Sequence, residues 1–317
     1  MTDQPTPVRV PPEYTGQRID RVLAQLFPEW SRSKLCMWLK EGLITVNHRI
    51  YKPNDKVWGG EEIVLTVCPN NTPLQHKAED LPLDILFEDE DVLVLNKAPG
   101  LIVHPGAGNP SGTLLNALLH HYEPIQYVPR AGIVHRLDKD TSGIMVVAKT
   151  LEAQTHLVRQ MQARDIQRQY LALVYGHVIA GKTISTGYGR DTRNRLKMAV
   201  MDQGKPAITH FTVRKQYQFV SLLNVALHTG RTHQIRVHMA YIKHPIVGDA
   251  LYHNRNSLKA GMSVDLRQTL TTFPRQALHA HTLSFQHPIL GTPLTFEAPI
   301  PYDFQTLLDF LDEDIPV

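Results

Sequence analysis

The chain has little cysteine, no long apolar run and no strong excess of charge of either sign. Only two of its 317 residues are cysteines, Cys36 and Cys68, which is too few for a disulfide framework or a cysteine-based metal site. No apolar run approaches the roughly 18 residues that a membrane span needs. Residues 1–5 are polar and lack a signal-peptide pattern. These absences argue against a disulfide-stapled or membrane-spanning protein, and we expect a reducing, cytoplasmic setting.

The distribution of charge is more informative than its total. The net charge is only +3, which is a weak argument for nucleic-acid binding. Residues 18–56, however, contain eight basic and four acidic side chains, so that this segment carries 8 − 4 = +4 and the rest of the chain carries 3 − 4 = −1. Localised basic charge in an otherwise balanced chain indicates a polyanion-binding module near the N-terminus.

Composition and periodicity divide the chain into four parts. Residues 1–15 are rich in proline and lack apolar periodicity, which predicts a disordered arm. Residues 16–68 predict two short helices followed by a small sheet. Residues 69–82 have the Pro, Asn, Thr and Gln content of a linker. Residues 83–317 contain both apolar strand patterns and amphipathic helical patterns, which indicates a second, larger domain that combines strands and helices.

The most informative stretch is the run 135–143, with the sequence HRLDKDTSG. The apolar run that follows it, residues 144–148, predicts a buried strand. A polar turn that leads into a buried strand is a common way to hold a side chain rigidly at the edge of a core. By local sequence alone, Asp138 and Asp140 are explained equally well as turn residues.

A second polar stretch, residues 228–239, has the sequence HTGRTHQIRVHM. Its three histidines suggest a metal site, but the spacing argues against one. On a strand His233 and His238 would point to opposite faces, and on a helix they would lie about 140° apart. The chain also lacks an HExxH motif and a cysteine pair. We therefore expect no metal ligand among these histidines.

Three segments together resemble the RluA-type pseudouridine synthases. They are the run 135–143, the strand pattern RQYLALVYG at 168–176, and GRTHQIRVH at 230–238. In that family the aspartate of the first segment is the nucleophile, the tyrosine of the second lies against the target base, and the second arginine of the third pairs with the nucleophile. The resemblance therefore implies that Asp138, Tyr170 and Arg236 are catalytic.

The same resemblance implies a set of RNA contacts. Arg136 precedes the nucleophile, and its planar guanidinium would fill the gap that an extruded uridine leaves. The other RNA contacts implied near the catalytic residues are His135, Arg231, His233 and Gln234. Residues 16–68 resemble the S4 RNA-binding domain, which implies RNA contacts for Arg32 and Lys34 at the start of the second helix. The alternative for this segment is a small α+β adaptor with solvated basic side chains.

The implied activity is isomerisation of uridines to pseudouridine in 23S ribosomal RNA, in the stem-loop called helix 69, without a cofactor or a metal. The partner would be large-subunit ribosomal RNA or a pre-ribosomal particle, and we expect a monomer that does not contact a membrane. Alternatives are the same reaction on another RNA, and a non-catalytic ribosome-assembly protein. A third is a hydrolase using Asp138 and Asp140, which needs carboxyl groups about 5–9 Å apart across a sugar-sized cleft.

The expected architecture is α+β, with an S4-like module followed by a catalytic domain. The catalytic domain should contain a large, mainly antiparallel sheet flanked by helices. Asp138, Tyr170 and Arg236 are far apart in the sequence, so this interpretation requires the fold to bring them into one cleft.

Overall fold

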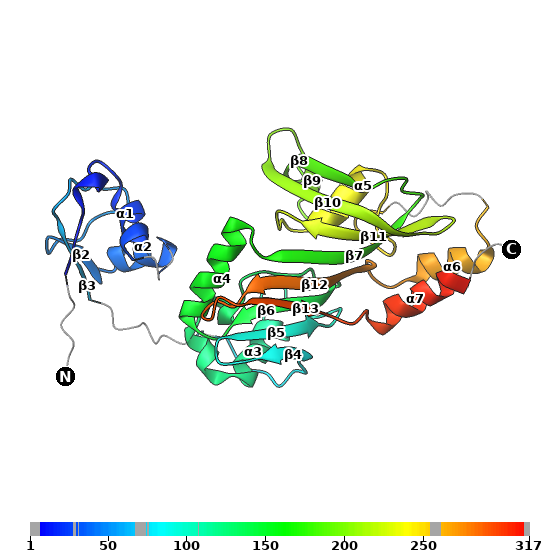
Figure 1. Ribbon diagram of the computed structural model, residues 1–317, viewed down its shortest axis with the longest axis horizontal. Coiled ribbons are helices and arrows are strands. Elements are labelled where there is room, and N and C mark those ends of the chain that lie inside the picture. Colours follow the sequence, from blue (N-terminus) through cyan, green and yellow to red (C-terminus); the bar gives the residue numbers. More distant parts are fainter. Residues whose placement is uncertain are drawn as a thin grey trace. The chain divides into compact units, whose positions relative to one another are not determined.

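The computed structural model describes residues 7–27, 30, 32–66, 74, 76–106, 108–253 and 261–313, with only the backbone at positions 33 and 34. The chain divides into two compact units, Met1–Leu74 and Gln75–Val317, which are described separately (Figure 1). Much of the predicted linker, residues 69–73 and 75, lies outside the described residues. Within the second unit, Asn116 donates a hydrogen bond to the carbonyl oxygen of Lys77 (2.7 Å), so this end of the predicted linker is packed against the unit.

The first unit combines two helices with a three-stranded antiparallel sheet in the order β1-β3-β2. Its elements are β1 (Val8–Arg9), α1 (Ile19–Leu26), α2 (Arg32–Lys40), β2 (Ile44–Val46) and β3 (Glu62–Leu65). The apolar faces of the two helices and of the sheet form one core, with Ile19, Leu23, Leu35 and Trp38 buried. The two predicted helices and the two strands predicted after them are confirmed, whereas β1, which precedes the helices, was not predicted.

Residues 8–14 differ from the disordered arm that the sequence predicted. Val8 pairs with Ile63 of β3, and Val10 is only 1% exposed because it belongs to the core of the unit. Pro12–Tyr14 form a single 3₁₀ turn. A β-branched residue at each of positions 8 and 10 thus anchors this segment, whereas residues 1–6 lie outside the described part of the chain.

The second unit is built around a ten-stranded sheet in the order β4-β5-β6-β12-β7-β11-β10-β8-β9, with β13 paired to β12. The strands are β4 (Ile85–Glu88), β5 (Val92–Lys97), β6 (Ser142–Ala148), β7 (Gln167–Tyr175), β8 (Lys182–Arg190), β9 (Met198–Val200), β10 (Lys205–Gln216), β11 (Val220–Leu227), β12 (Leu278–Gln286) and β13 (Pro293–Glu297). Among the described strands, only β6 and β12 pair in parallel. The expected large, mainly antiparallel sheet is confirmed.

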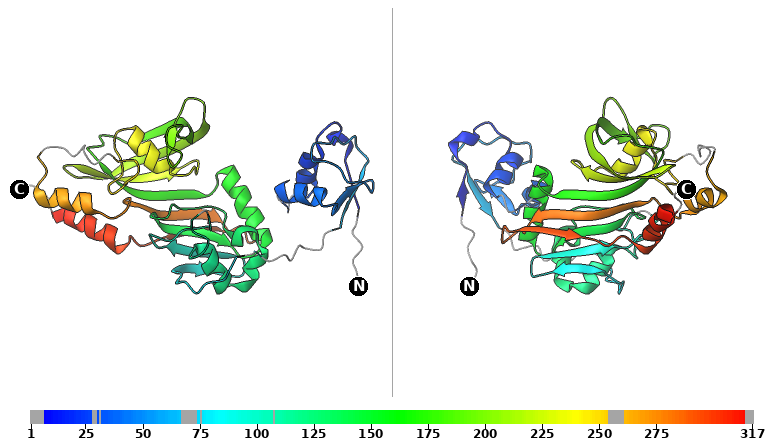
Figure 2. Two further views of the ribbon diagram at one scale, coloured as in Figure 1. Left: turned by 180° about the vertical axis from the view of Figure 1, so that it is seen from behind. Right: turned by 45° about the vertical axis from the view of Figure 1, so that its right-hand side comes forward.

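Five α-helices of the described residues accompany this sheet, and Figure 1 shows how they are arranged around it. They are α3 (Leu114–His121), α4 (Leu151–Ala163), α5 (Gln234–Tyr241), α6 (Val264–Thr272) and α7 (Tyr302–Glu313). Figure 2 shows α6 and α7 side by side at one end of the strands, where the rings of Phe273 and Phe304 pack together. None of the described helices combines the length and apolar character that a membrane span requires.

The two polar stretches that the sequence singles out, residues 135–143 and 228–239, are positioned by buried elements. Every residue of β6 is buried, which confirms the predicted strand after the run 135–143 and anchors that run at the start of β6. The stretch 228–239, for which strand and helix were both open, forms a turn followed by α5. His238 on α5 is fully buried, with its ring nitrogens bonded to the hydroxyls of Thr186 (3.0 Å) and Thr209 (2.8 Å). It is thus a core histidine.

Buried neutral histidines predict a loss of stability in mild acid. His238 and His279 are both fully buried, and burial lowers the pKa of each to about 4. In the unfolded chain each pKa is about 6.5. Between these values the unfolded state binds protons that the folded state does not, so the free energy of unfolding falls as the pH falls.

We expect each of these histidines to lower the free energy of unfolding by about 2 kcal/mol when the pH falls from 7.5 to 5. Urea unfolding at both pH values measures the change. A His279→Asn variant should show a smaller pH dependence than the wild-type protein. Equal free energies of unfolding at the two pH values would contradict the assignment of neutral buried histidines.

Candidate active site

A pocket of about 240 Å³ opens where three segments of the second unit meet. Its lining includes the turn 133–138 before β6, the start of β7, and the turn 230–236 that leads into α5. Asp138, Tyr170 and Arg236 all line it. The fold therefore brings together the three residues that the sequence singled out as catalytic.

Asp138 and Arg236 form an ion pair in this pocket. Nη1 of Arg236 donates to Oδ2 of Asp138 at 3.0 Å. The two side chains are only 15% and 9% exposed, so water screens their attraction weakly. The backbone N–H of Thr141 donates to the carbonyl oxygen of Asp138, which closes the turn that carries the carboxylate. This geometry holds the carboxylate in a fixed place.

Asp249 orients Arg236, and the sequence interpretation missed it. Its two carboxylate oxygens accept from Nε (2.7 Å) and Nη2 (2.9 Å) of Arg236. Because this bidentate pair uses one edge of the guanidinium, Nη1 is left to face Asp138. Burial by itself would lower the pKa of Arg236. The charges of Asp249 and Asp138, and the hydrogen bonds that they accept from the guanidinium, outweigh it and raise this pKa. Position 249 follows a glycine in a short turn between apolar residues, and nothing in that local pattern distinguishes a buried partner from a turn residue.

A second connection to Asp138 runs through His233 and Tyr252. His233 has a left-handed backbone (φ 58°) at the N-cap of α5, which turns its ring toward the pocket. Nδ1 lies 2.8 Å from the Tyr252 hydroxyl, and Nε2 lies 3.9 Å from Oδ1 of Asp138. Asp249 also accepts hydrogen bonds from the backbone of Tyr252, whose ring lies over the Arg236 guanidinium. Burial lowers the pKa of His233.

Tyr170 provides an aromatic surface in the pocket. It lies on β7, between β12 and β11, where its residue partners are Ala280 and Val225. It is only 6% exposed, and burial raises the pKa of its hydroxyl. A neutral phenol ring offers a face for stacking a base and competes little as a nucleophile.

Two of the predicted RNA contacts are exposed arginines at the pocket. Arg136 and Arg231 both line the pocket and are exposed. His135 also lines it, but Nε2 of its ring accepts a hydrogen bond from the backbone N–H of Val146 (3.0 Å). Burial lowers the pKa of His135 to about 3, so its ring is neutral near pH 7 and ties the turn to β6.

Gln234 is committed to the protein rather than to the pocket. Its amide oxygen accepts from Thr229 (2.8 Å) and from the backbone N–H of Arg231 (3.0 Å). Its amide nitrogen donates to the carbonyl oxygen of Ile208 and the hydroxyl of Thr209. All four hydrogen-bonding positions of the side chain are thus used, and we leave Gln234 out of the RNA contacts proposed below.

The two RNA contacts predicted in the first unit lie on α2. Arg32 pairs with the carboxylate of Asp20 at 2.6 Å while its side chain stays 48% exposed, so the guanidinium keeps donors on its free side. Asp20 also pairs with Arg18 (2.9 Å). The side chain of Lys34 lies outside the described part of the chain.

Lys97 braces the turn that carries Asp138. Its Nζ donates to the carbonyl oxygens of Ala98 (2.8 Å), Leu101 (2.9 Å) and Lys139 (2.9 Å). Lys97 is 1% exposed, and this burial lowers its pKa to about 7. The side chain thus joins the end of β5 to the residue that follows Asp138.

We expect Lys97→Met to lower the free energy of unfolding by about 2–3 kcal/mol, because three partly buried carbonyl oxygens lose their donor. It should also slow the reaction, because the Asp138 turn loses a support. Urea unfolding and single-turnover rates measure the two effects. Lys182→Met, at an exposed position of β8, is the control. Wild-type stability and rate in Lys97→Met would show that this brace is dispensable.

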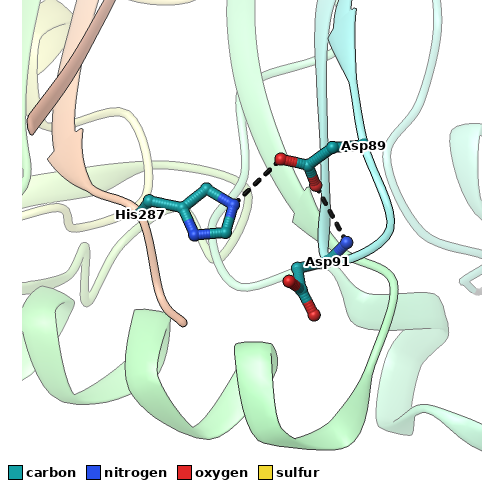
Figure 3. A group of neighbouring side chains, drawn as sticks. All are labelled: Asp89, Asp91 and His287. Atoms are coloured by element: carbon teal, nitrogen blue, oxygen red, sulfur yellow. Dashed lines mark hydrogen bonds and ion pairs between the residues drawn. The ribbon is translucent and has the colours of Figure 1, made fainter. Parts of the chain in front are cut away.

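One group of side chains in the described part of the chain has metal-ligand spacing, and it lies outside the pocket. Asp89, Asp91 and His287 place ligand atoms within 4.8 Å of one another (Figure 3). Nδ1 of His287 accepts from the backbone of Leu290 (3.0 Å), and Nε2 therefore donates to Oδ2 of Asp89 (2.9 Å). Oδ1 of Asp89 accepts from the backbone of Asp91 and Val92. Because these bonds occupy His287 and Asp89, we interpret the group as a clasp between two turns and assign it no metal.

The fold and the site together define an enzyme that modifies RNA. The family model for the S4 domain matches residues 17–63, and the family model described as RNA pseudouridylate synthase matches residues 91–241. The second match contains Asp138, Tyr170 and Arg236.

Relatives that are similar over nearly the whole chain show the family to which it belongs. Proteins named ribosomal large subunit pseudouridine synthase D are 51% identical over 305 residues in Xylella fastidiosa and 50% identical over 306 residues in Haemophilus influenzae. Both alignments cover 96% of this chain, and 92% and 94% of the relatives. The solved structure of human RNA pseudouridylate synthase domain containing 1 is 26% identical, with a TM-score of 0.55 over 72% of this chain and 87% of its own. The chain belongs to the RNA pseudouridylate synthase family and is an RNA isomerase.

Proposed function

We propose that this chain isomerises specific uridines of large-subunit ribosomal RNA to pseudouridine, with the stem-loop helix 69 of 23S RNA as its target. The observation that carries the proposal is the Asp138–Arg236 pair, 3.0 Å long, beside Tyr170 in one pocket. The names of the relatives, at about half sequence identity over nearly the full chain, support ribosomal RNA as the substrate.

The reaction moves a base from one of its atoms to another. The N1–C1′ bond of uridine breaks, a C5–C1′ bond forms, and the proton on C5 is replaced by one on N1, so no atom is gained or lost. We assign Asp138 as the nucleophile at the sugar. Arg236 holds the carboxylate in place by a charge-assisted hydrogen bond, and Tyr170 offers a surface on which the detached base can turn.

The target uridine must leave its stack to enter the pocket, which costs a few kcal/mol. We assign Arg136 to the vacated position, because its guanidinium is exposed and planar. Arg231 and His233 would contact the RNA around the pocket. His135 would contribute to RNA binding indirectly, by supporting the turn before β6. In the S4-like unit, Arg32 and Lys34 would contact the RNA backbone. We place the monomeric enzyme in the cytoplasm, on large-subunit RNA or a pre-ribosomal particle.

Purified protein incubated with unmodified transcripts tests this proposal. We expect pseudouridine in the helix 69 loop of a 23S transcript, and none in 16S RNA or transfer RNA, when the sites are mapped chemically. Pseudouridine in a different RNA alone would keep the reaction and replace the target. Binding to 23S RNA without any pseudouridine, in the naked transcript or in pre-ribosomal particles, would favour a non-catalytic assembly protein.

A further inference from the structure

Within the described part of the chain, Arg168 is a cation in the pocket without a hydrogen-bonding or ionic partner. It lies near the start of β7, is half-buried, and lines the same pocket as Asp138 and Tyr170. Its guanidinium makes no hydrogen bond or ion pair within the described part of the chain, and its Nε is buried without an acceptor. Buried donors in folded proteins are nearly always satisfied, so this one calls for a ligand that the protein chain itself does not provide.

The backbone is shaped to accommodate this guanidinium. A Cβ atom placed on Gly230 would lie 2.7 Å from Nη1 of Arg168. Gly230 does not have a left-handed backbone, so no turn geometry requires glycine at that position. The advantage of glycine there is the space that it leaves for Arg168.

The surroundings provide no negative charge for Arg168. Of the residues that line the pocket, only Asp138 carries a carboxylate, and that carboxylate accepts from Arg236. His135 is neutral, because burial, reinforced by the charge of Arg168, lowers its pKa to about 3. The guanidinium is therefore poised for an anionic group that arrives with the substrate.

We propose that Arg168 contacts the substrate by binding an anionic oxygen of the target nucleotide. This inference rests on the proposed function. Arg168 and Tyr170 are two residues apart on β7 and point to the same face of the strand, so a nucleotide whose base lies against Tyr170 comes within reach of Arg168. The anionic oxygen belongs either to the phosphate of that nucleotide or to the uracil, which takes up the electron pair when the N1–C1′ bond breaks.

Four variants measured together test the proposal. Arg168→Met removes the charge, Arg168→Lys keeps it without the planar fork, and Gly230→Ala pushes the guanidinium from its place. Arg267→Met, on the exposed side of α6, controls for the loss of one positive charge. The readouts are the RNA dissociation constant, the single-turnover rate at saturating protein, and thermal unfolding.

We expect Arg168→Met to lose roughly 10- to 100-fold in overall efficiency, as for one charge-assisted hydrogen bond. If the partner is the phosphate, the dissociation constant rises and the saturating rate is kept. If the partner is the uracil, the saturating rate falls and the dissociation constant is kept. Gly230→Ala should change the same quantity in the same direction by a smaller factor, and Arg168→Lys should retain part of the efficiency.

Suppose that the wild-type protein is active, and that Arg168→Met and Gly230→Ala both lie within twofold of it in the RNA dissociation constant and in the single-turnover rate. That result would overturn the inference and leave the proposed function intact. An equal loss in Arg267→Met would also overturn it, because the effect would then be one of net charge. A wild-type protein that makes no pseudouridine in any ribosomal RNA would defeat the proposed function and this inference together.

Discussion

Asp138→Asn is expected to abolish pseudouridine formation, with a fall in rate of at least about 10⁴-fold, as for the loss of a nucleophile elsewhere. Asparagine keeps the shape of the side chain but has neither the negative charge nor the nucleophilic oxygen. RNA binding should change little, because the RNA contacts proposed above are made by other side chains. Single-turnover conversion of a 23S transcript measures the rate, and filter binding measures the affinity.

Asp140→Asn is the matched control, since Asp140 lies in the same turn and its side chain has no hydrogen bond or ion pair to the described residues. We expect it to retain most of the wild-type rate. If Asp140→Asn were as inactive as Asp138→Asn, the assignment of a single catalytic carboxylate would be wrong, and a mechanism with paired carboxylates would gain support. If Asp138→Asn were active, another residue would carry the chemistry.

Arg236→Met is expected to lower both activity and stability. The rate should fall by about 10²–10³-fold, as for the loss of one charge-stabilising donor in other active sites. The free energy of unfolding should fall by about 3–5 kcal/mol, because removing one member of a buried ion pair leaves the other unpaired. Asp249 is that other member, with a side chain that is fully buried. Single-turnover rates and urea unfolding measure the two losses.

The two losses should separate in a double variant. Arg236→Met combined with Asp249→Asn removes both charges, so most of the stability should return while the rate stays low. Asp249→Asn alone should reduce the rate less than Arg236→Met does, because Nη1 of Arg236 can still reach Asp138. Recovery of the rate in the double variant would show that Arg236 acts only by neutralising Asp249.

The sequence was sufficient for much of the site because the relevant residues occur in ordered motifs. The run 135–143 and the stretch 230–238 each combine an unusual polar pattern with fixed spacing. Resemblance to a family then linked Asp138 to Arg236 across almost one hundred residues, and the structure places them in contact. The strand after Asp138 was predictable from its unbroken apolar run.

The supports of the site were not predictable in the same way. Asp249 acts through its pairing with Arg236, 13 residues earlier, and Lys97 reaches the carbonyl oxygen of Lys139, 42 residues later. The local patterns around both residues resemble ordinary turn and strand ends. That Arg168 has no partner among the described residues follows from the three-dimensional contacts and not from its local pattern. Similarly, Val10 joins the first core through a short pairing of β1 with β3, which the proline-rich composition around it obscured.

The most direct test is a pseudouridine map of total ribosomal RNA from cells that lack the protein, complemented with the wild-type chain or with Asp138→Asn. We predict that specific sites in the large-subunit RNA, in the helix 69 loop, disappear in the deletion and return only with the wild-type chain. Restoration by Asp138→Asn as well would contradict the catalytic assignment. An unchanged map in the deletion would contradict ribosomal RNA as the substrate.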